Sequence, residues 1–393
     1  MKIKVGVIFG GKSVEHEVSI ISAIQAINNI DKEKYDVLPI YMTKENDLYA
    51  GLNLGKIENY KNIKKLLSNS NKIIIVNDNN KIKLFKYPFK KLSNNYYDYV
   101  DIILPVVHGT NVEDGALQGY LKTLNIPFAG CDVESSAICM NKYATKTILK
   151  DSGIPVLDSL VINTYDYIDD PKKVLKEIKD KYKYPIIIKP INLGSSVGIN
   201  ISKNDKETLK ALDDGFSFAK EVLIERAITN LKEINCSVLG DKEEVTSSVC
   251  EEPIRLKEDI LSYEDKYLSG SKNNSKGMAS LGRKIPADID KEKEKIIRNY
   301  AEKTFKVLGC SGVVRIDFLM DQDTNEIYVN EINTIPGSLS FYLWEASNLK
   351  YKDLLTKIID LALKKERENK KLSYKFDTNI LENFNSSNKT GKI

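Results

Sequence analysis

The sequence predicts an α/β protein whose N-terminal domain is a doubly wound parallel sheet. Strands and helices alternate along the first third of the chain, which supports this class, and 393 residues exceed the length of one ordinary domain. The predicted elements are strands at residues 3–9, 35–41 and 101–107, helices at residues 13–28 and 116–124, and a hairpin from residues 72–76 and 82–85. We therefore expect two or three domains, the first of them with helices covering its sheet.

Three units and a tail are expected along the chain. The predicted boundaries are residues 1–130 for an N-terminal substrate-binding domain, 131–229 for a central domain, 230–368 for a C-terminal domain, and 369–393 for a disordered tail. The tail is charged and then rich in Asn and Ser, without apolar periodicity. A long polar segment at residues 252–286 is typical of a functional lid.

Three polar side chains follow strands of the first domain. Glu15, His108 and Glu113 fall at the carboxyl ends of predicted strands, where open α/β sheets bind their ligands. Glu15 also lies in the first turn of a helix, where a carboxylate interacts favourably with the helix dipole without any ligand. These residues are therefore candidate substrate contacts, with a purely structural role for Glu15 as the alternative.

Composition excludes some classes of partner. The chain has 59 basic and 55 acidic residues and a net charge of +4, which gives no electrostatic footprint for nucleic acid. No apolar stretch is long enough for a membrane span. Five cysteines lie far apart without a C-x-x-C pair, which favours buried thiols in a reducing compartment. We expect a cytoplasmic protein that binds neither nucleic acid nor membranes.

The segment from Arg315 to Gly337 carries the most specific chemistry. It contains R-I-D-F and then N-E-I-N-T-I-P-G, and the turn D-Q-D-T-N-E between them allows the two runs to pair as a hairpin. Side chains two apart share a face of a strand, so Asp317, Glu331 and Asn333 converge. Two carboxylates and a carboxamide are hard oxygen ligands that suit Mg²⁺ between protein and nucleotide phosphates.

The central unit supplies candidates for phosphate binding. Lys189 follows three aliphatic residues in P-I-I-I-K-P, so its ammonium needs a partner such as a nucleotide phosphate, unless it reaches solvent from an edge strand. The loop G-S-S-V-G at residues 194–198 offers flexible backbone and hydroxyl donors, and equally fits an ordinary turn. Glu225 follows V-L-I and either accepts a hydrogen bond from an adenine amino group or ends a strand.

The stretch from Gly6 to Ser13 matches the phosphate-loop pattern G-x-x-x-x-G-K-[ST], with Lys12 and Ser13 in the key positions. A phosphate loop turns its backbone amides inward, whereas residues 7–9 continue an alternating strand. We therefore expect a strand, a Gly-Gly turn and a helix at this point. A nucleotide-binding switch that uses this stretch is the hypothesis from a different functional class.

Several motifs in a fixed order resemble one enzyme family. The motifs G-G-K-S-V-E-H-E-V-S, H-G-T-N-V-E-D-G-A-L-Q-G, G-S-S-V-G and E-I-N-T-I-P-G are similar to those of the D-alanine–D-alanine ligases, which are ATP-grasp enzymes. The resemblance covers residues 1–368. It implies an ATP-grasp fold, in which two α+β domains clamp ATP beside the N-terminal domain. It also implies two D-amino acid substrates and a homodimer.

The resemblance also implies a role for each matching residue. Nucleotide contacts are implied for Lys142, Lys189, Ser196, Glu225, Glu233 and Lys266, and ligation of two Mg²⁺ ions (or Mn²⁺) for Asp317, Glu331 and Asn333. Catalytic roles are implied for Glu15, Ser195, Tyr267, Arg315 and the N–H of Gly337. Substrate contacts are implied for Glu15, His108, Glu113, Ser338 and Tyr342. In this mechanism ATP converts D-alanine to an acyl phosphate, an amine attacks it, and Arg315 with Gly337 stabilises the oxyanion.

The second substrate is the open point. The family usually has a Thr and a later Ser after P-G, whereas this chain has S-L-S-F-Y-L-W. That run, the segment S-K-G-M-A-S and the long first domain look most like the vancomycin-resistance D-alanine–D-serine ligases, so D-serine is favoured. The lid tyrosine Tyr267 argues for an amine over a hydroxy acid. The alternatives are D-alanine as second substrate, and a related carboxylate–amine ligase with another acceptor.

Overall fold

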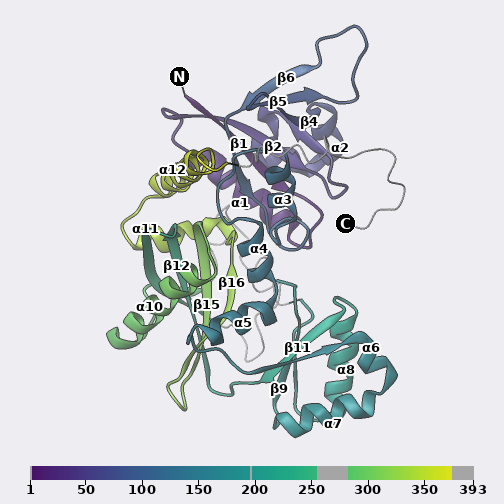
Figure 1. Cartoon of the computed structure of the whole chain (residues 1–393), viewed down its shortest axis with the longest axis vertical. Coiled ribbons are helices and arrows are strands. Elements are labelled where there is room, and N and C mark those ends of the chain that lie inside the picture. Colours follow the sequence, from purple (N-terminus) through teal and green to yellow (C-terminus); the bar gives the residue numbers. More distant parts are fainter. Residues whose placement is uncertain (1, 195–196, 255–281, 374–393) are drawn as a thin grey trace, which may run out of the picture.

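The computed structural model describes residues 2–194, 197–254 and 282–373. Within these ranges the chain forms three sheets, each in its own lobe, and the lobe of the third sheet lies between those of the first and the second (Figure 1). The expected mixed α/β architecture is present, and the predicted domain boundaries stay a prediction.

The first sheet contains seven strands in the order β6-β5-β4-β3-β2-β1-β7. Its strands are β1 (Ile3–Gly10), β2 (Tyr35–Met42), β3 (Leu48–Ala50), β4 (Asn71–Asp78), β5 (Lys81–Lys86), β6 (Tyr96–Val100) and β7 (Ile102–Val106). Its helices are α1 (His16–Asn29), α2 (Ile63–Ser68) and α3 (Ala116–Thr123), with 3-10 turns η1 (Leu52–Gly55) and η2 (Ile57–Asn62).

Only part of this sheet is parallel. Strands β1, β2 and β7 pair in parallel, whereas β3 to β6 are added one after another in antiparallel pairs. The loops at residues 43–47 and 79–80 are too short for a crossover, so the strands that they join must be antiparallel. The predicted hairpin between β4 and β5 is confirmed, and the parallel sheet expected for the whole domain is confined to three strands.

The structure contradicts the phosphate-loop hypothesis for residues 6–13. Gly6 lies inside β1, and a Cβ added there would stand 2.8 Å from Ile103 Cδ1, so this glycine allows close packing between strands. The next amides are already used, because Gly10 N–H donates to Ser19 Oγ and Gly11 N–H to Met42 O. The stretch is therefore a buried strand and a turn, and it cannot wrap a phosphate.

The second sheet has four strands in the order β10-β9-β11-β8. Its elements are β8 (Ser159–Asn163), α6 (Thr164–Asp169), α7 (Pro171–Lys181), β9 (Ile186–Pro190), β10 (Asn200–Ser202), α8 (Asp205–Phe216) and β11 (Glu221–Arg226). Apolar residues of α7 and α8, among them Ile178 and Leu212, pack against Ile188 and Ile224 of the sheet. This core holds β9 and β11 side by side and thereby brings Lys189 and Glu225 together.

The third sheet has the order β14-β13-β12-β15-β16. Its strands are β12 (Leu231–Gly240), β13 (Val245–Pro253), β14 (Arg283–Lys284), β15 (Gly312–Asp321) and β16 (Ile327–Asn333). The accompanying helices are α4 (Val133–Met140), α5 (Lys142–Asp151), α10 (Lys291–Val307) and α11 (Phe341–Ala346), and the 3-10 turn η4 (Gly337–Ser340) precedes α11. Helices α4, α5 and α10 share one core with this sheet, so residues 131–151 pack onto the third sheet as well as leading to the second.

The last helix returns to the first domain. Helix α12 (Tyr351–Asn369) buries Leu354, Leu355 and Ile358 in the same core as β1 and α1, and Figure 1 shows it beside the first lobe. No helix among the described residues is both long and apolar enough to cross a bilayer. All five cysteines are buried, as expected.

Candidate active site

The hairpin of β15 and β16 places the predicted metal ligands on one face of the third sheet. The register opposes Arg315 to Asn333 and Asp317 to Glu331, and side chains of opposed residues in antiparallel strands project from the same face. The predicted hairpin and the predicted convergence are thus both present. An irregularity in the pairing after Asp317 leaves Asn330 as an extra residue on β16.

Asp317 is the centre of this face. Arg315 donates to it through Nε and Nη2 at 2.6 and 2.7 Å, and Asn333 Nδ2 donates at 3.1 Å. Burial alone would lower the pKa of Arg315, but Asp317 raises it well above its ordinary value, so the guanidinium stays charged. Two carboxylates and a carboxamide therefore lie beside a fixed cation, and this oxygen-rich donor set fits hard divalent ions such as Mg²⁺.

A buried cluster of lysines adjoins these ligands on the side of the central domain. Glu225 is fully buried and pairs with Lys146 at 2.5 Å and with Lys189 at 2.6 Å. Burial alone would raise the pKa of Glu225, but the two lysines hold it below its ordinary value. Lys142 lies 3.7 Å from Glu331 and donates to Leu193 O at 2.6 Å. Positive charge exceeds negative charge here, which suits a polyphosphate.

Lys146 was missed by the sequence analysis. It lies four residues after Lys142 on α5, so both ammonium groups come from one face of the helix. Burial lowers the pKa of Lys146, Glu225 opposes this effect, and Lys189 adds to it. The i, i+4 spacing was the available signal. Its partner Glu225 lies on another element, so the sequence did not show the pairing.

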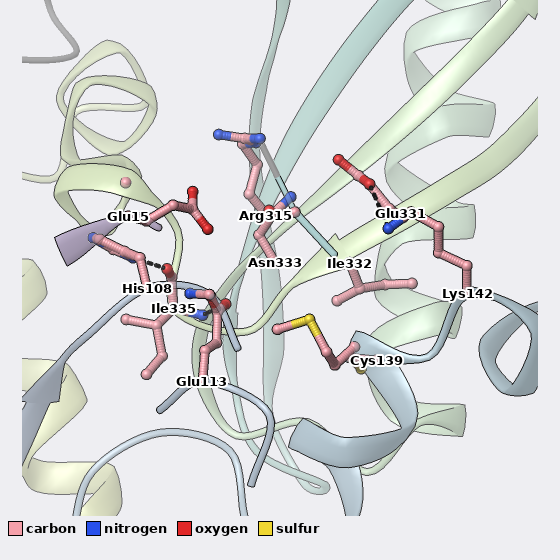
Figure 2. Close-up of a pocket in the computed structure, with 14 residues that line it drawn as sticks. Glu15, His108, Glu113, Cys139, Lys142, Arg315, Glu331, Ile332, Asn333 and Ile335 are labelled. Carbon is pink, nitrogen blue, oxygen red and sulfur yellow. Dashed lines mark hydrogen bonds and ion pairs between the residues drawn. The ribbon is translucent and has the colours of Figure 1, made fainter. Parts of the chain in front are cut away.

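Glu15 faces the same cleft from the first domain. Figure 2 shows Glu15, His108 and Glu113 on one side and Lys142 and Glu331 on the other, with Arg315 and Asn333 between them. The empty space of the cleft, including the part that is open to solvent, is about 720 Å³. Glu15 is only 7% exposed, and a Cβ on Gly194 would stand 3.2 Å from Glu15 Oε2, so Gly194 lies against this carboxylate.

The cleft therefore joins three chemical surfaces: a lysine cluster, an oxygen-rich hairpin, and a buried carboxylate of the first domain. Two family profiles match the chain. The profile for the D-ala D-ala ligase N-terminus matches residues 4–131, and that for the D-ala D-ala ligase C-terminus matches residues 148–360. The chain belongs to the D-alanine–D-alanine ligase family. Members of this family are ATP-dependent, ADP-forming ligases that join a carboxylate to an amine, so the chain is an enzyme of this type.

Individual relatives agree with the family. The D-alanine–D-alanine ligase of Thermosipho africanus is 38% identical over 380 residues, covering 97% of this chain and 98% of the relative. Among solved structures, the D-alanine–D-alanine ligase of Coxiella burnetii has a TM-score of 0.76 at 31% identity, covering 94% of this chain and 96% of the other. The D-Ala:D-Ser ligase VanG of Enterococcus faecalis has a TM-score of 0.74 at 30% identity, covering 92% and 100%. The ATP-grasp fold is thereby confirmed.

These comparisons do not group the chain with the D-serine ligases in preference to the D-alanine ligases. The relative named above and the Coxiella structure are both D-alanine–D-alanine ligases, and VanG is no more similar to the chain than the Coxiella enzyme is. The expected closeness to the vancomycin-resistance enzymes is therefore unsupported, while membership of the wider ligase family is shown.

His108 and Glu113 reach the cleft but bond to the protein. His108 Nδ1 lies 2.8 Å from Ile335 O, and Glu113 Oε1 accepts from Ile335 N–H at 2.8 Å and from the Thr334 hydroxyl at 3.2 Å. Burial, with a further contribution from Glu15, raises the pKa of Glu113 to about 7. Substrate contact by either side chain remains a prediction. Their observed partners belong to the segment that precedes Gly337.

Ser338 and Tyr342, predicted to meet the second substrate, are both buried. The backbone N–H of Ser338 donates to Ser22 Oγ at 2.9 Å. The Tyr342 hydroxyl donates to Glu251 at 3.1 Å, and the Arg283 guanidinium lies 4.1 Å from the centre of its ring. The Tyr342 hydroxyl therefore has a protein partner in this structure, and the predicted substrate role of both residues stays a prediction.

Some predicted site residues receive no structural description. Ser195, Ser196, Lys266 and Tyr267 lie outside the described residues, as does most of the expected lid. Glu233 is described on β12, in register with Leu319 of β15, two residues before Asn235, which opposes Asp317. Its predicted contact with the nucleotide remains a prediction.

Proposed function

We propose that this chain joins D-alanine to a second D-amino acid, through a D-alanyl phosphate, in the synthesis of peptidoglycan precursors. The observation that carries this proposal is the position of Asp317, Glu331 and Asn333 between the lysine cluster and Glu15. This order along the cleft suits a reaction that moves a phosphoryl group from a nucleotide to an amino acid carboxylate.

Each end of the cleft has a separate task in this proposal. Lys142 and Lys189 hold the phosphates, and Glu15 accepts the ammonium of the first D-alanine. Two divalent ions held by Asp317, Glu331 and Asn333 would neutralise phosphate charge and orient the transferred group. Arg315 and the Gly337 N–H then face the oxyanion that forms when the second amine attacks the acyl phosphate. Loss of one such donor typically costs about 2.7–4 kcal/mol of transition-state stabilisation.

We favour D-alanine as the second substrate. The relatives that match nearly the full chain at 38–40% identity bear the name D-alanine–D-alanine ligase. D-Serine, which the run after Gly337 favours, is the second candidate, and the structural match to VanG supports it at 30% identity.

A product assay tests the function and the choice of acceptor together. Purified enzyme with ATP and Mg²⁺ is given D-alanine alone, D-alanine with D-serine, or L-alanine, and ADP and dipeptides are quantified. We expect ADP release that requires D-alanine, with D-alanyl-D-alanine in excess even when D-serine is present at equal concentration. Excess D-alanyl-D-serine would assign the acceptor to D-serine. ADP release that is indifferent to D-amino acids would refute the ligase proposal.

A further inference from the structure

Three side chains of the first domain hold the turn that carries Gly337. Glu113 accepts from the N–H of Ile335 at 2.8 Å, and His108 bonds to the carbonyl of the same residue at 2.8 Å. Ser22 Oγ accepts from the N–H of Ser338 at 2.9 Å. Gly337 lies between these anchors, in the cleft wall, and Figure 2 shows His108 and Glu113 both directed at Ile335.

The hydrogen bonds around His108 fix its tautomer. The Ile335 carbonyl can only accept, so Nδ1 of His108 carries a proton and donates it. Nε2 lies 3.0 Å from Ser22 Oγ, which already accepts from Ser338 N–H, so the Ser22 hydroxyl proton points to Nε2. Burial lowers the pKa of His108 although Glu15 opposes this effect, and the ring is neutral. A continuous chain of bonds thus runs from Ser338 through Ser22 and His108 to Ile335.

The turn needs external anchors. Ser338, Leu339 and Ser340 have φ angles of 52°, 53° and 50°, a left-handed run that residues with a side chain rarely adopt. Within the turn, Leu339 N–H donates to Pro336 O at 2.7 Å. Strained backbone of this kind persists only where surrounding contacts determine it, and here these contacts come from another domain.

We propose that Ser22 and His108 are positioning residues that hold the Gly337 N–H in place for the oxyanion, and that neither exchanges a proton with substrate. The proposal rests on the ligase function given above. It assigns a role to Ser22, which belongs to no motif singled out in the sequence. It also means that the second reaction step depends on the contact between the first domain and the turn after β16. Formation of the acyl phosphate does not use this donor, so only the amine attack should depend on the relay.

Ser19 offers a matched control for Ser22. Both are buried serines of α1, and each hydroxyl takes part in two hydrogen bonds, but Ser19 accepts from Gly10 N–H and donates to Val106 O, both within the first domain. Ser22→Ala and Ser19→Ala should therefore lose similar amounts of thermal stability. Only Ser22→Ala should slow the attack of the second amine on the acyl phosphate.

The test compares two rates in each variant. Dipeptide formation reports both steps, whereas acyl phosphate that is released by denaturing the enzyme and then trapped with hydroxylamine as D-alanyl hydroxamate reports the first step alone. In Ser22→Ala we expect dipeptide formation to fall about 10–100-fold while trapping falls less than about threefold, and the KM for ATP should not change. Equal losses in both rates, or the same pattern in Ser19→Ala, would overturn the relay.

His108→Asn is a second, independent variant. Its amide nitrogen can still donate to Ile335 O in the place of Nδ1, but the contact with Ser22 is lost. We expect slower dipeptide formation with the limbs of the pH–rate profile unmoved, because a neutral His108 contributes no ionisation. Loss of one limb would show that His108 exchanges a proton in the reaction and would refute the proposal. Failure of the ligase function is recognisable separately, since the wild-type enzyme would then give neither dipeptide nor hydroxamate.

Discussion

Two buried glutamates, Glu113 in the cleft wall and Glu225 in the lysine cluster that adjoins the cleft, respond to their surroundings in opposite ways. Glu225 is flanked by Lys146 and Lys189, which hold its pKa below the ordinary value against the effect of burial. Glu113 is also buried, but its charged neighbour is Glu15, and its pKa is raised to about 7. Both residues are buried glutamates, so the neighbouring charges make the difference.

The difference separates the tasks of the two ends. The nucleotide end keeps its carboxylate ionised between lysines and therefore presents fixed charges to a polyanion. The amino acid end places two carboxyl groups near each other and leaves room for an ammonium, which would relieve their repulsion. The hairpin that is proposed to bind the metal lies between the ends, so a change there should affect both.

Asp317→Asn should have the largest effect. The substitution keeps the shape of the side chain but removes the charge that pairs with Arg315 and would bind a divalent ion. Loss of a ligand that contributes several kcal/mol predicts a fall in turnover of about 10³-fold, measured as ADP release. Calorimetric titration with Mn²⁺ in the presence of ADP should show weakened metal binding.

Asp321→Asn is the control for Asp317→Asn. Asp321 lies four residues further along β15 and pairs with Arg226 at 3.0 Å, away from the cleft. Its loss should lower the melting temperature without changing the dependence on metal. Wild-type turnover in a folded Asp317→Asn enzyme would remove the metal site from the mechanism.

Lys146→Met should weaken the nucleotide end alone. One charge-assisted contact contributes about 1.5–3 kcal/mol, so the KM for ATP should rise about tenfold or more, while that for D-alanine stays within about twofold. Lys150→Met is the matched control, because Lys150 lies one turn later on α5 and pairs with Asp158 on the surface. A similar rise in both variants would indicate a general disturbance of the helix.

Glu113→Gln should alter the pH dependence of stability. Glu113 has a folded pKa of about 7 and an ordinary value of 4.5, so between these pH values the folded state binds more protons than the unfolded state. The free energy of unfolding contributed by this group therefore falls as the pH rises from 4.5 to 7, by at most about 1.4 kcal/mol per pH unit.

Denaturant titrations at several pH values measure this slope. Glu113→Gln should flatten this slope over that interval. The substitution also places an amide group where a carboxylate oxygen accepted from the Gly109 N–H, which lowers the free energy of unfolding at every pH. Glu225 contributes to the pH dependence with the opposite sign. Its lowered pKa increases the free energy of unfolding above pH 4.5, and this increase is lost as the pH falls below that value. Identical slopes in the wild type and Glu113→Gln would show that Glu113 is ionised as readily in the folded enzyme as in the unfolded chain.

Local features of this site could be predicted from sequence, and distant ones could not. Asp317, Glu331 and Asn333 lie on two strands joined by a short turn, so alternation and the hairpin were enough to bring them together. Lys146 was within reach through its spacing from Lys142. The first sheet was only partly predicted, because alternation of strands and helices identifies the parallel strands but does not show how far antiparallel strands extend the edge.

Ser22 marks the limit of that reasoning. Its partner Ser338 is 316 residues away, and although Ser338 directly follows a family motif, nothing in the sequence links it to Ser22. The contact exists because α1 and the turn after β16 come from different domains that meet at the cleft. Only the tertiary arrangement supplies this information.

Lys12→Ala should have the smallest effect, and it tests whether the nucleotide end is correctly placed. Lys12 is exposed and follows a buried strand whose amides are already bonded, so its removal should leave the KM for ATP unchanged and shift stability by no more than about 0.5 kcal/mol. Steady-state kinetics with varied ATP, beside Lys146→Met, provides the measurement. A rise in the KM for ATP as large as that of Lys146→Met would move the nucleotide to the first domain and reverse the assignment of the two ends.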